Sequence, residues 1–457
     1  MASLVSTRRL GLVTRHLTPS VASPSSFVSS SASSPRLLST STTRQNSLKQ
    51  PYPYIFTTAS TFHGKPPPPS PVGSSSDSPS PRKSRTPPRL AQGLPDSHPL
   101  IGWRDAQLAD GPPHGAGHDW FFVEGIPRPL SNEGGVQGLK AGEDGVRGVV
   151  MGIADGVGGW EESGVDPSHF SQALMYFARE RVRLSASSAS EQPSSPSQSG
   201  WAWPAEEKQR NGERLRELLR GAFEDVKGEK AIVAGSSTAC LLALDAETGM
   251  LHAANLGDSG FLVFRPQPPA ELPPTPPSSP SSPPPPPQPI TYKLLHSQPP
   301  QVFFFNAPAQ LSKFPRGEDT SNALLSSPKD AATHSLQLED GDVVLLFTDG
   351  FSDNVFDEGE ADVLVSAVRS KLDALASASA ASEEGAPEPS RAERDKDLAS
   401  SLARTAVAFA RMIAVRHDKV TPFEREADKW IGRGKHGMQG GKVDDVTVCV
   451  AVVRKEE

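Results

Sequence analysis

Short apolar runs bounded by turn residues predict a series of β-strands along the chain. Each run is rich in β-branched or aromatic residues and has the length of a buried or half-buried strand. The runs occupy residues 119–124, 148–154, 237–244, 250–256, 260–264, 291–295, 342–347 and 447–453. The connections at 245–249 and 257–259 are short, so we expect the three strands that they join to form antiparallel hairpins.

Between these strands, apolar residues recur every three or four positions and predict helices. Such faces are present at residues 170–177, 213–226, 363–372 and 398–413. Asp166 and Pro167 precede the first of them and provide an N-cap and a first-turn proline. One apolar face on each helix is the pattern of a helix that packs on a sheet.

The remaining composition limits how much of the chain forms a core. The sequence has 457 residues, 46 of them proline, and contains long serine tracts. We therefore expect one domain over 100–457 with insertions near 185–210, 266–289 and 377–396, preceded by a Pro/Ser-rich linker at 77–99. The proline-rich insertion is interpreted either as an exposed linker or as a ligand of a proline-binding module. No run approaches the roughly 18 apolar residues of a membrane span.

The first 76 residues differ from the rest in charge. They contain no Asp or Glu, but carry arginines such as Arg8, Arg9 and Arg15 among many Ser and Thr residues. This composition is typical of an organellar transit peptide, and the Arg-Leu-Leu-Ser sequence at 36–39 resembles a mitochondrial processing site. The alternative is a basic disordered tail. Without these residues and their seven basic side chains, the net charge changes from −7 to −14, which argues against nucleic acid as a partner.

Cys240 and Cys449 both lie in apolar strand-like runs. This position favours buried reduced thiols over a disulfide or a metal site. The sequence therefore predicts a reducing compartment, in agreement with a matrix location after import.

The apolar run at 148–154 ends in Asp155, which is followed by Gly156 and further glycines. A carboxylate at a strand end, next to glycines that allow a carbonyl oxygen to come close, suits a metal site. The alternative is a strand followed by a glycine-rich turn that Asp155 merely starts.

Other aspartates follow the same pattern. Asp258 and Asp349 come just after predicted strands, whereas Asp119 and Asp444 come just before them. In an antiparallel sheet the end of one strand lies beside the start of its neighbour, so all five can share one edge. Carboxylates gathered in this way repel one another, and oxygen ligands select hard ions such as Mg²⁺ or Mn²⁺. Zinc-type His/Cys spacing is missing among these positions, and a two-metal site of this kind suits phosphoryl transfer to water.

Four ordered motifs make the chain similar to the PP2C-type metal-dependent protein serine/threonine phosphatases. They are DGVGGW at 155–160, GDS at 257–259, TDGFSD at 348–353 and DDVT at 444–447, and the resemblance covers roughly residues 100–453. The segments GVDP at 164–167 and FNAPAQL at 305–311 resemble the mitochondrial branch of that family. The resemblance implies an α+β fold, a β-sandwich of two antiparallel sheets flanked by helices.

The resemblance also implies roles for individual residues. Asp155 would bridge two metal ions and Gly156 would lend its backbone carbonyl. Asp349 and Asp444 would complete the binuclear site, so that these three aspartates carry catalysis, and Asp119 would act through a bound water.

A weaker third ion is implied at Asp258 and Asp353, while Asp445 stands where the family often has Asn and receives no metal role. The implied activity is hydrolysis of phosphoserine and phosphothreonine in mitochondrial phosphoproteins by a water activated at a Mg²⁺ or Mn²⁺ pair. We expect a monomer with phosphoprotein substrates, without a nucleic-acid partner or a membrane span.

Three departures from the family pattern leave a second function open. His118 precedes Asp119 where an acidic residue is usual, Val157 stands where many members have a proton-donating His, and Arg104 is only a weak counterpart of the phosphate-binding Arg. They are the features expected of a catalytically weak pseudophosphatase that binds phosphoproteins. A calcium-binding module is disfavoured because the Asp-rich loop spacing of such sites is missing.

Overall fold

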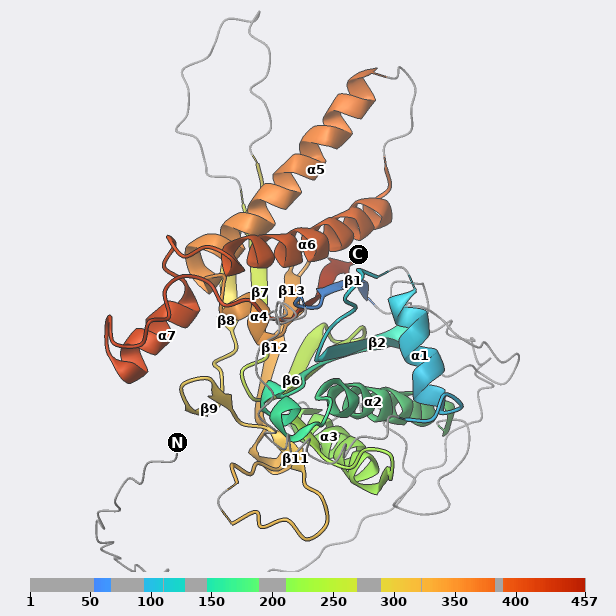
Figure 1. Ribbon diagram of the computed structural model, residues 1–457. Helices are drawn as coiled ribbons and strands as arrows, with labels where there is room; N and C mark the ends of the chain where they lie inside the picture. Colours follow the sequence, from blue (N-terminus) through green and yellow to red (C-terminus); the bar gives the residue numbers. More distant parts are fainter. Residues whose placement is uncertain are drawn as a thin grey trace, which may run out of the picture. The chain divides into compact units, whose positions relative to one another are not determined.

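The computed structural model describes residues 53–66, 94–109, 111–127, 146–188, 211–268, 289–321, 323–382 and 389–456 (Figure 1). The chain divides into two units, Met1–Gln50 and Pro51–Glu457, and all described residues belong to the second. The basic amino-terminal segment as far as residue 52 and most of the predicted insertions lie outside the described residues.

Two five-stranded antiparallel sheets form the centre of this unit. The first has the spatial order β1 (Tyr54–His63), β14 (Val446–Lys455), β13 (Val343–Phe347), β7 (Gly260–Gln267) and β8 (Thr291–Ser297). The second has the order β12 (Ala332–Gln337), β6 (Met250–Leu256), β5 (Ala239–Asp245), β3 (Val146–Asp155) and β2 (Asp119–Pro127). Two smaller antiparallel pairs join β9 (Val302–Phe304) to β10 (Ala307–Pro308), and β11 (Leu311–Lys313) to β4 (Gly235–Ser237).

Helices cover the outer faces of both sheets (Figure 1). On the second sheet lie α2 (Ser168–Ser188) and α3 (Asn211–Gly228), with α1 (Pro99–Leu108) packed on α2. On the first sheet lie α5 (Asp362–Ser382) and α6 (Arg391–Ala414). The short α4 (Asp349–Ser352) follows β13, and α7 (Pro422–Ile431) precedes the last strand.

Both faces of the central strands are buried, which explains why they appear as unbroken apolar runs. In β13, Leu345 packs toward α5 and α6, whereas Leu346 packs into the core between the two sheets. Cys240 and Cys449 lie in that inner core as free, buried thiols, as predicted. The expected α+β sandwich of two antiparallel sheets flanked by helices is confirmed.

The expectation that order begins near Leu100, after a leader that includes residues 54–63, is wrong. Strand β1 pairs with β14 along its whole length, from Tyr54 opposite Lys455 to His63 opposite Val446. Phe56 is 2% exposed and belongs to the core between the sheets. The strand is aromatic and β-branched, but its partner lies at the far end of the chain, so local composition placed it in the basic leader.

The hairpin expected between β6 and β7 is also wrong, whereas that between β5 and β6 is confirmed. β6 and β7 belong to different sheets, and the turn at 257–259 carries the chain from one to the other. Gly257 has a φ of 108°, a conformation that favours glycine and lets the chain turn sharply.

Helices and strands extend into the ranges predicted as insertions. α5 extends to Ser382 and α6 begins at Arg391, so much of 377–396 is helical. Likewise β7 extends to Gln267 and α2 to Ser188. Helical and strand periodicity therefore continues into the polar segments that composition assigned to insertions.

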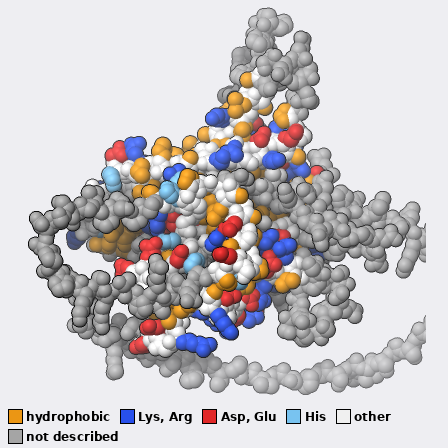
Figure 2. Space-filling view, turned by 45° about the vertical axis from the view of Figure 1, so that its right-hand side comes forward, with side chains coloured by type: hydrophobic (Ala, Val, Ile, Leu, Met, Phe, Trp, Pro, Cys, Tyr) orange, Lys and Arg blue, Asp and Glu red, His pale blue; other side chains and the backbone are white. Residues whose placement is uncertain are grey.

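On the face shown in Figure 2, acidic and basic side chains lie interspersed. None of the helices that the structure describes is long and apolar enough to cross a bilayer.

Candidate metal centre

Two carboxylates meet where β2 begins and β3 ends. Asp119 opens β2 and pairs in register with Asp155, the last residue of β3. Asp119 is fully buried, and its Oδ2 accepts a hydrogen bond of 2.7 Å from Thr348 Oγ1. Because Thr348 follows β13, this bond joins the edge of the second sheet to that of the first.

Two further carboxylates reach the same place from the first sheet. Asp258 lies in the turn that enters β7, and Asp349 lies directly after β13 as the first residue of α4. Carboxylate oxygens of Asp155, Asp258 and Asp349 lie within 4.8 Å of one another. The expectation that the aspartates share the edge of one sheet is therefore wrong, because the cluster forms between the edges of two sheets.

A lysine stands among these carboxylates. Lys442 Nζ lies 2.5 Å from Asp349 Oδ2, 2.8 Å from Asp353 Oδ2 and 3.0 Å from Asp444 Oδ2. Its side chain is only 16% exposed. The backbone N–H and C=O of Lys442 both bond to the Asn354 side chain, at 2.9 Å each, so the segment after α4 fixes the position of this lysine.

A second lysine approaches from β1. Lys65 Nζ lies 3.1 Å from Asp444 Oδ1, and the Lys65 backbone N–H donates to Asp445 Oδ1 at 2.6 Å. The His118 N–H donates to Asp445 Oδ2 at 2.8 Å. Asp445 thus ties the end of β1 and the loop before β2 to the start of β14. A Cβ at Gly117 would lie 1.9 Å from Asp445 Oδ1, so glycine is required beside this carboxylate.

The backbone after Asp155 is also closely packed. The Gly156 N–H donates to the His118 carbonyl at 3.1 Å, and a Cβ at Gly156 would lie 2.6 Å from the Pro167 carbonyl oxygen. The Val157 N–H donates to the Ser236 carbonyl at 3.0 Å. Each of these contacts limits the backbone position of the glycine whose carbonyl is the expected metal ligand.

The electrostatics of the cluster reflect its excess of negative charge. Burial, together with repulsion from Asp349 and Asp119, raises the pKa of Asp155 well above its usual value. Burial raises the pKa of Asp258 to about 6 even though Lys442 acts in the opposite direction. Burial also acts to raise the pKa of Asp444, but Lys442 and Lys65 outweigh it and lower that pKa.

This donor set fits hard divalent cations. Its side-chain donors are carboxylate oxygens, the ligand type that Mg²⁺ and Mn²⁺ prefer. Asp258 Oδ1 is buried and has no hydrogen-bond partner in another described residue, so it is available to an ion. Within the described ranges, carboxylates outnumber the ammonium groups of Lys65 and Lys442, and cations compensate such an excess.

Most of the residues singled out from the sequence come together, but not all. The aspartates predicted to bind metal meet either directly or through Lys442 (Asp119, Asp155, Asp258, Asp349, Asp353 and Asp444). Arg104 instead pairs with its neighbour Asp105 on α1, at 2.8 Å. His118 Nε2 lies 3.0 Å from Glu161 Oε1.

Sequence reasoning missed both lysines. Lys442 lies two residues before the final aspartate motif, which is the one local signal that could have drawn attention to it. Lys65 lay in the segment interpreted as a leader, so nothing local pointed to it.

Comparisons with known proteins identify relatives over most of the chain. No protein-family model matches the sequence. The protein phosphatase PTC7 homologue fig of Drosophila willistoni is 30% identical over 365 residues, covering 80% of this chain and 84% of that protein. The human protein phosphatase PTC7 homologue is 29% identical over 306 residues, covering 66% and 75% of the two chains. Among solved structures, the photosystem II phosphatase PBCP is similar with a TM-score of 0.42 and 24% identity, covering 76% of this chain and 94% of that chain. The chain therefore belongs to the PTC7 family of PP2C-type protein serine/threonine phosphatases.

Proposed function

We propose that Asp155, Gly156, Asp349 and Asp444 bind a pair of Mg²⁺ or Mn²⁺ ions, with Asp119 acting through a water. The observation that carries this proposal is the approach of carboxylate oxygens from both sheets to within 4.8 Å of one another. At that spacing, charges that lack a cation repel strongly. A divalent pair would offset the repulsion with ligands that the fold already holds in place.

Asp258 and Asp353 would hold a weaker third ion. Asp258 Oδ1 has no hydrogen-bond partner in another described residue, and Asp353 shares Lys442 with Asp349. This position has two proposed carboxylate ligands, whereas the pair has three, so we expect an ion here to bind less tightly than the pair.

When bound, such a pair supplies a Lewis acid that activates water and stabilises charge on the phosphoryl group. The residues of the chain position these groups. Thr348 holds Asp119 in one orientation through its hydrogen bond, and Asn354 fixes the backbone of Lys442. The Lys65 side chain is 36% exposed, and its ammonium group beside Asp444 offers a cationic donor to an incoming phosphoryl oxygen.

We further propose that the substrates are phosphoserine and phosphothreonine residues of mitochondrial proteins. Support comes from the acid-free, arginine-containing start of the chain. Cleavage near Ser39 would leave β1 and Lys65 in the mature enzyme, because β1 begins at Tyr54. A transit peptide that included β1 would remove an edge strand of the first sheet.

A reporter fused to residues 1–50 tests the location. We expect it to enter mitochondria and to be shortened there. A version with Arg8, Arg9 and Arg15 replaced by Glu should stay in the cytosol, because import requires the basic face. A parent fusion that remains full length in the cytosol would refute the mitochondrial assignment.

Metal binding tests the proposed site separately from catalysis. The full chain, freed of metal with EDTA and titrated with Mn²⁺ in a calorimeter, should bind at least two ions. Asp349→Asn should lose binding at the pair, whereas Asp373→Asn, which changes a partly exposed carboxylate on α5, should bind like the parent. Equal binding by Asp349→Asn and the parent would contradict the assignment.

A further inference from the structure

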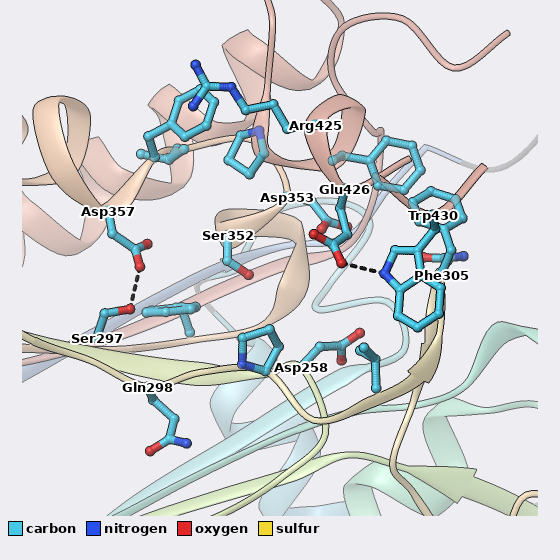
Figure 3. A pocket seen from close by; sticks show the side chains of 18 of the residues that line it. Asp258, Ser297, Gln298, Phe305, Ser352, Asp353, Asp357, Arg425, Glu426 and Trp430 are labelled. Atoms are coloured by element: carbon cyan, nitrogen blue, oxygen red, sulfur yellow. Dashed lines mark hydrogen bonds between the residues drawn. The ribbon is translucent and has the colours of Figure 1, made fainter. Parts of the chain in front are cut away.

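A cavity of about 540 Å³ opens beside the carboxylate cluster. Asp258 and Asp353 line the side that faces the cluster. The other walls come from the turn after β8, the β9–β10 connection, the segment after α4, and α7 (Figure 3). The volume is in the range of pockets that bind small ligands or several side chains.

One wall of this cavity is aromatic. Phe305 and Phe423 pack with their ring centroids 5.2 Å apart. Trp430 of α7 is 46% exposed, and its indole N–H donates to Glu426 Oε1 at 2.5 Å. In Figure 3, Trp430 lies beside Phe305 on one side of the cavity, away from Ser297 and Asp357. These rings form an apolar surface that is open to solvent.

Acidic side chains outnumber basic ones around the cavity, and two of them are ion-paired, Asp353 with Lys442 at 2.8 Å and Glu426 with Lys429 at 3.2 Å. Five of its lining residues are acidic (Asp258, Asp353, Asp357, Glu358 and Glu426), and Arg425 is the basic one among the described lining residues. The Arg425 guanidinium lies 4.4 Å from the centre of the Phe356 ring. A positively charged ligand would be attracted to the carboxylates that line the cavity.

The wall formed by α7 is tied to the proposed catalytic site. The Phe423 N–H donates to the Asp353 carbonyl at 3.0 Å, and Thr421 Oγ1 donates to the Gly440 carbonyl at 2.6 Å. Asp353 in turn pairs with Lys442. The aromatic wall is therefore held in register with the carboxylates, and the cavity is formed before a ligand arrives.

We propose that this cavity binds the part of the phosphoprotein next to the phosphorylated residue, and that it selects a large apolar side chain accompanied by Lys or Arg. The apolar side chain packs against Phe305, Phe423 and Trp430, while the basic residue pairs with Asp357, Glu358 or Glu426. Because an extended peptide advances about 3.3 Å per residue, a cavity that shares Asp258 and Asp353 with the cluster reads positions close to the phosphate. This proposal rests on the proposed function and adds a substrate class to it.

Three phosphothreonine peptides of equal length test this selection on the full chain with Mn²⁺. One carries Leu and Arg near the phosphothreonine, the second has Ser in place of Leu, and the third has Glu in place of Arg. We expect kcat/KM to fall about tenfold for each replacement, mainly through KM, as for the loss of one well-packed contact.

Trp430→Ala should lower kcat/KM for the Leu/Arg peptide about tenfold more than kcat/KM for p-nitrophenyl phosphate, a substrate too small to reach the aromatic wall. Met412→Ala is the matched control, since Met412 is also a large apolar side chain on a helix and is 51% exposed. It should change neither value. The proposal is overturned if Trp430→Ala changes both substrates equally, or if the three peptides react alike.

A binding measurement separates failure of the cavity from failure of the proposed function. The fluorescence anisotropy of the labelled Leu/Arg peptide reports binding even when nothing is hydrolysed. If the parent binds this peptide at least tenfold more tightly than the Glu peptide and Trp430→Ala loses the preference, the cavity assignment holds regardless of turnover. Equal binding of both peptides by the parent contradicts it.

Discussion

Lys442 Nζ lies 2.5 Å from Asp349 Oδ2, so an ammonium group stands among the carboxylates that the two sheets bring together. The same nitrogen contacts Asp353 and Asp444. Burial opposes its charge, but these three carboxylates raise the pKa of Lys442 well above its usual value. The lysine is a fixed counter-ion that supports the cluster alongside any bound metal.

Replacing Lys442 by Gln removes this counter-ion. We expect the metal-free protein to lose about 3 kcal/mol of stability, because buried carboxylates are left without their partner. Saturating Mn²⁺ should reduce the difference between variant and parent, since the ions then supply the missing charge. The measurement is the thermal midpoint in EDTA and in Mn²⁺, with Lys371→Gln on the exposed face of α5 as control. Equal midpoints of Lys442→Gln and parent in EDTA would contradict this role.

Replacing glycine by alanine should lower the stability of the protein at one position and raise it at another. A Cβ at Gly350 would lie 2.0 Å from the Asp445 carbonyl oxygen, whereas a Cβ at Gly102 in α1 meets nothing within 4 Å. We expect Gly350→Ala to cost roughly 1–3 kcal/mol through overpacking. Gly102→Ala should stabilise the protein by up to about 1 kcal/mol, because alanine favours the helix. Urea midpoints measure both, and a Gly350→Ala protein as stable as the parent would show that this contact is not rigid.

A histidine pair between the edge strands of the two sheets predicts a loss of stability in acid. The His296 and His334 rings stack with centroids 4.0 Å apart, and Phe261 lies 4.9 Å from His296. Burial, with a smaller contribution from His334, lowers the pKa of His296 to about 4. The unfolded chain therefore binds a proton near pH 6.5 that the folded protein does not, so this contribution to stability is present above pH 6.5 and is lost as the pH falls toward 4.

His296→Phe tests this sign. The drop in thermal midpoint between pH 7 and pH 5 should be smaller in His296→Phe than in the parent, because the variant has no proton to bind at this position. His417→Phe, at an exposed position, should retain the full drop. A drop of the same size in His296→Phe and parent would show that His296 does not contribute.

Some elements of the fold could be predicted from the sequence, and others could not. Apolar runs that end in an aspartate identified β3 and β13, because strands buried on both faces show as unbroken apolar segments. The turn at 257–259 could not be interpreted correctly, since a short connection between two sheets has the same length as a hairpin. Strand β1 was missed because its pairing with β14 is a contact between the two ends of the domain.

Likewise, the sequence predicted some residues of the candidate site and missed others. Five of its carboxylates were found because each lies near a strand end, which is a local signal, whereas Asp353 was found only through the family resemblance. Lys65 was missed because only the pairing of β1 with β14 brings it to Asp444. Helix α7 was missed although Thr421, Pro422 and Glu424 have the spacing of a helix start, and with it the aromatic wall that it contributes.

The most direct test of the proposed metal centre is hydrolysis of a phosphothreonine peptide by the full chain. We predict turnover that disappears with EDTA and returns with Mn²⁺. Asp155→Ala and Asp349→Ala should each lower kcat by several orders of magnitude, because each removes a proposed ligand of the metal pair. Turnover that survives EDTA, or parent-like turnover in either variant, would contradict the proposed centre.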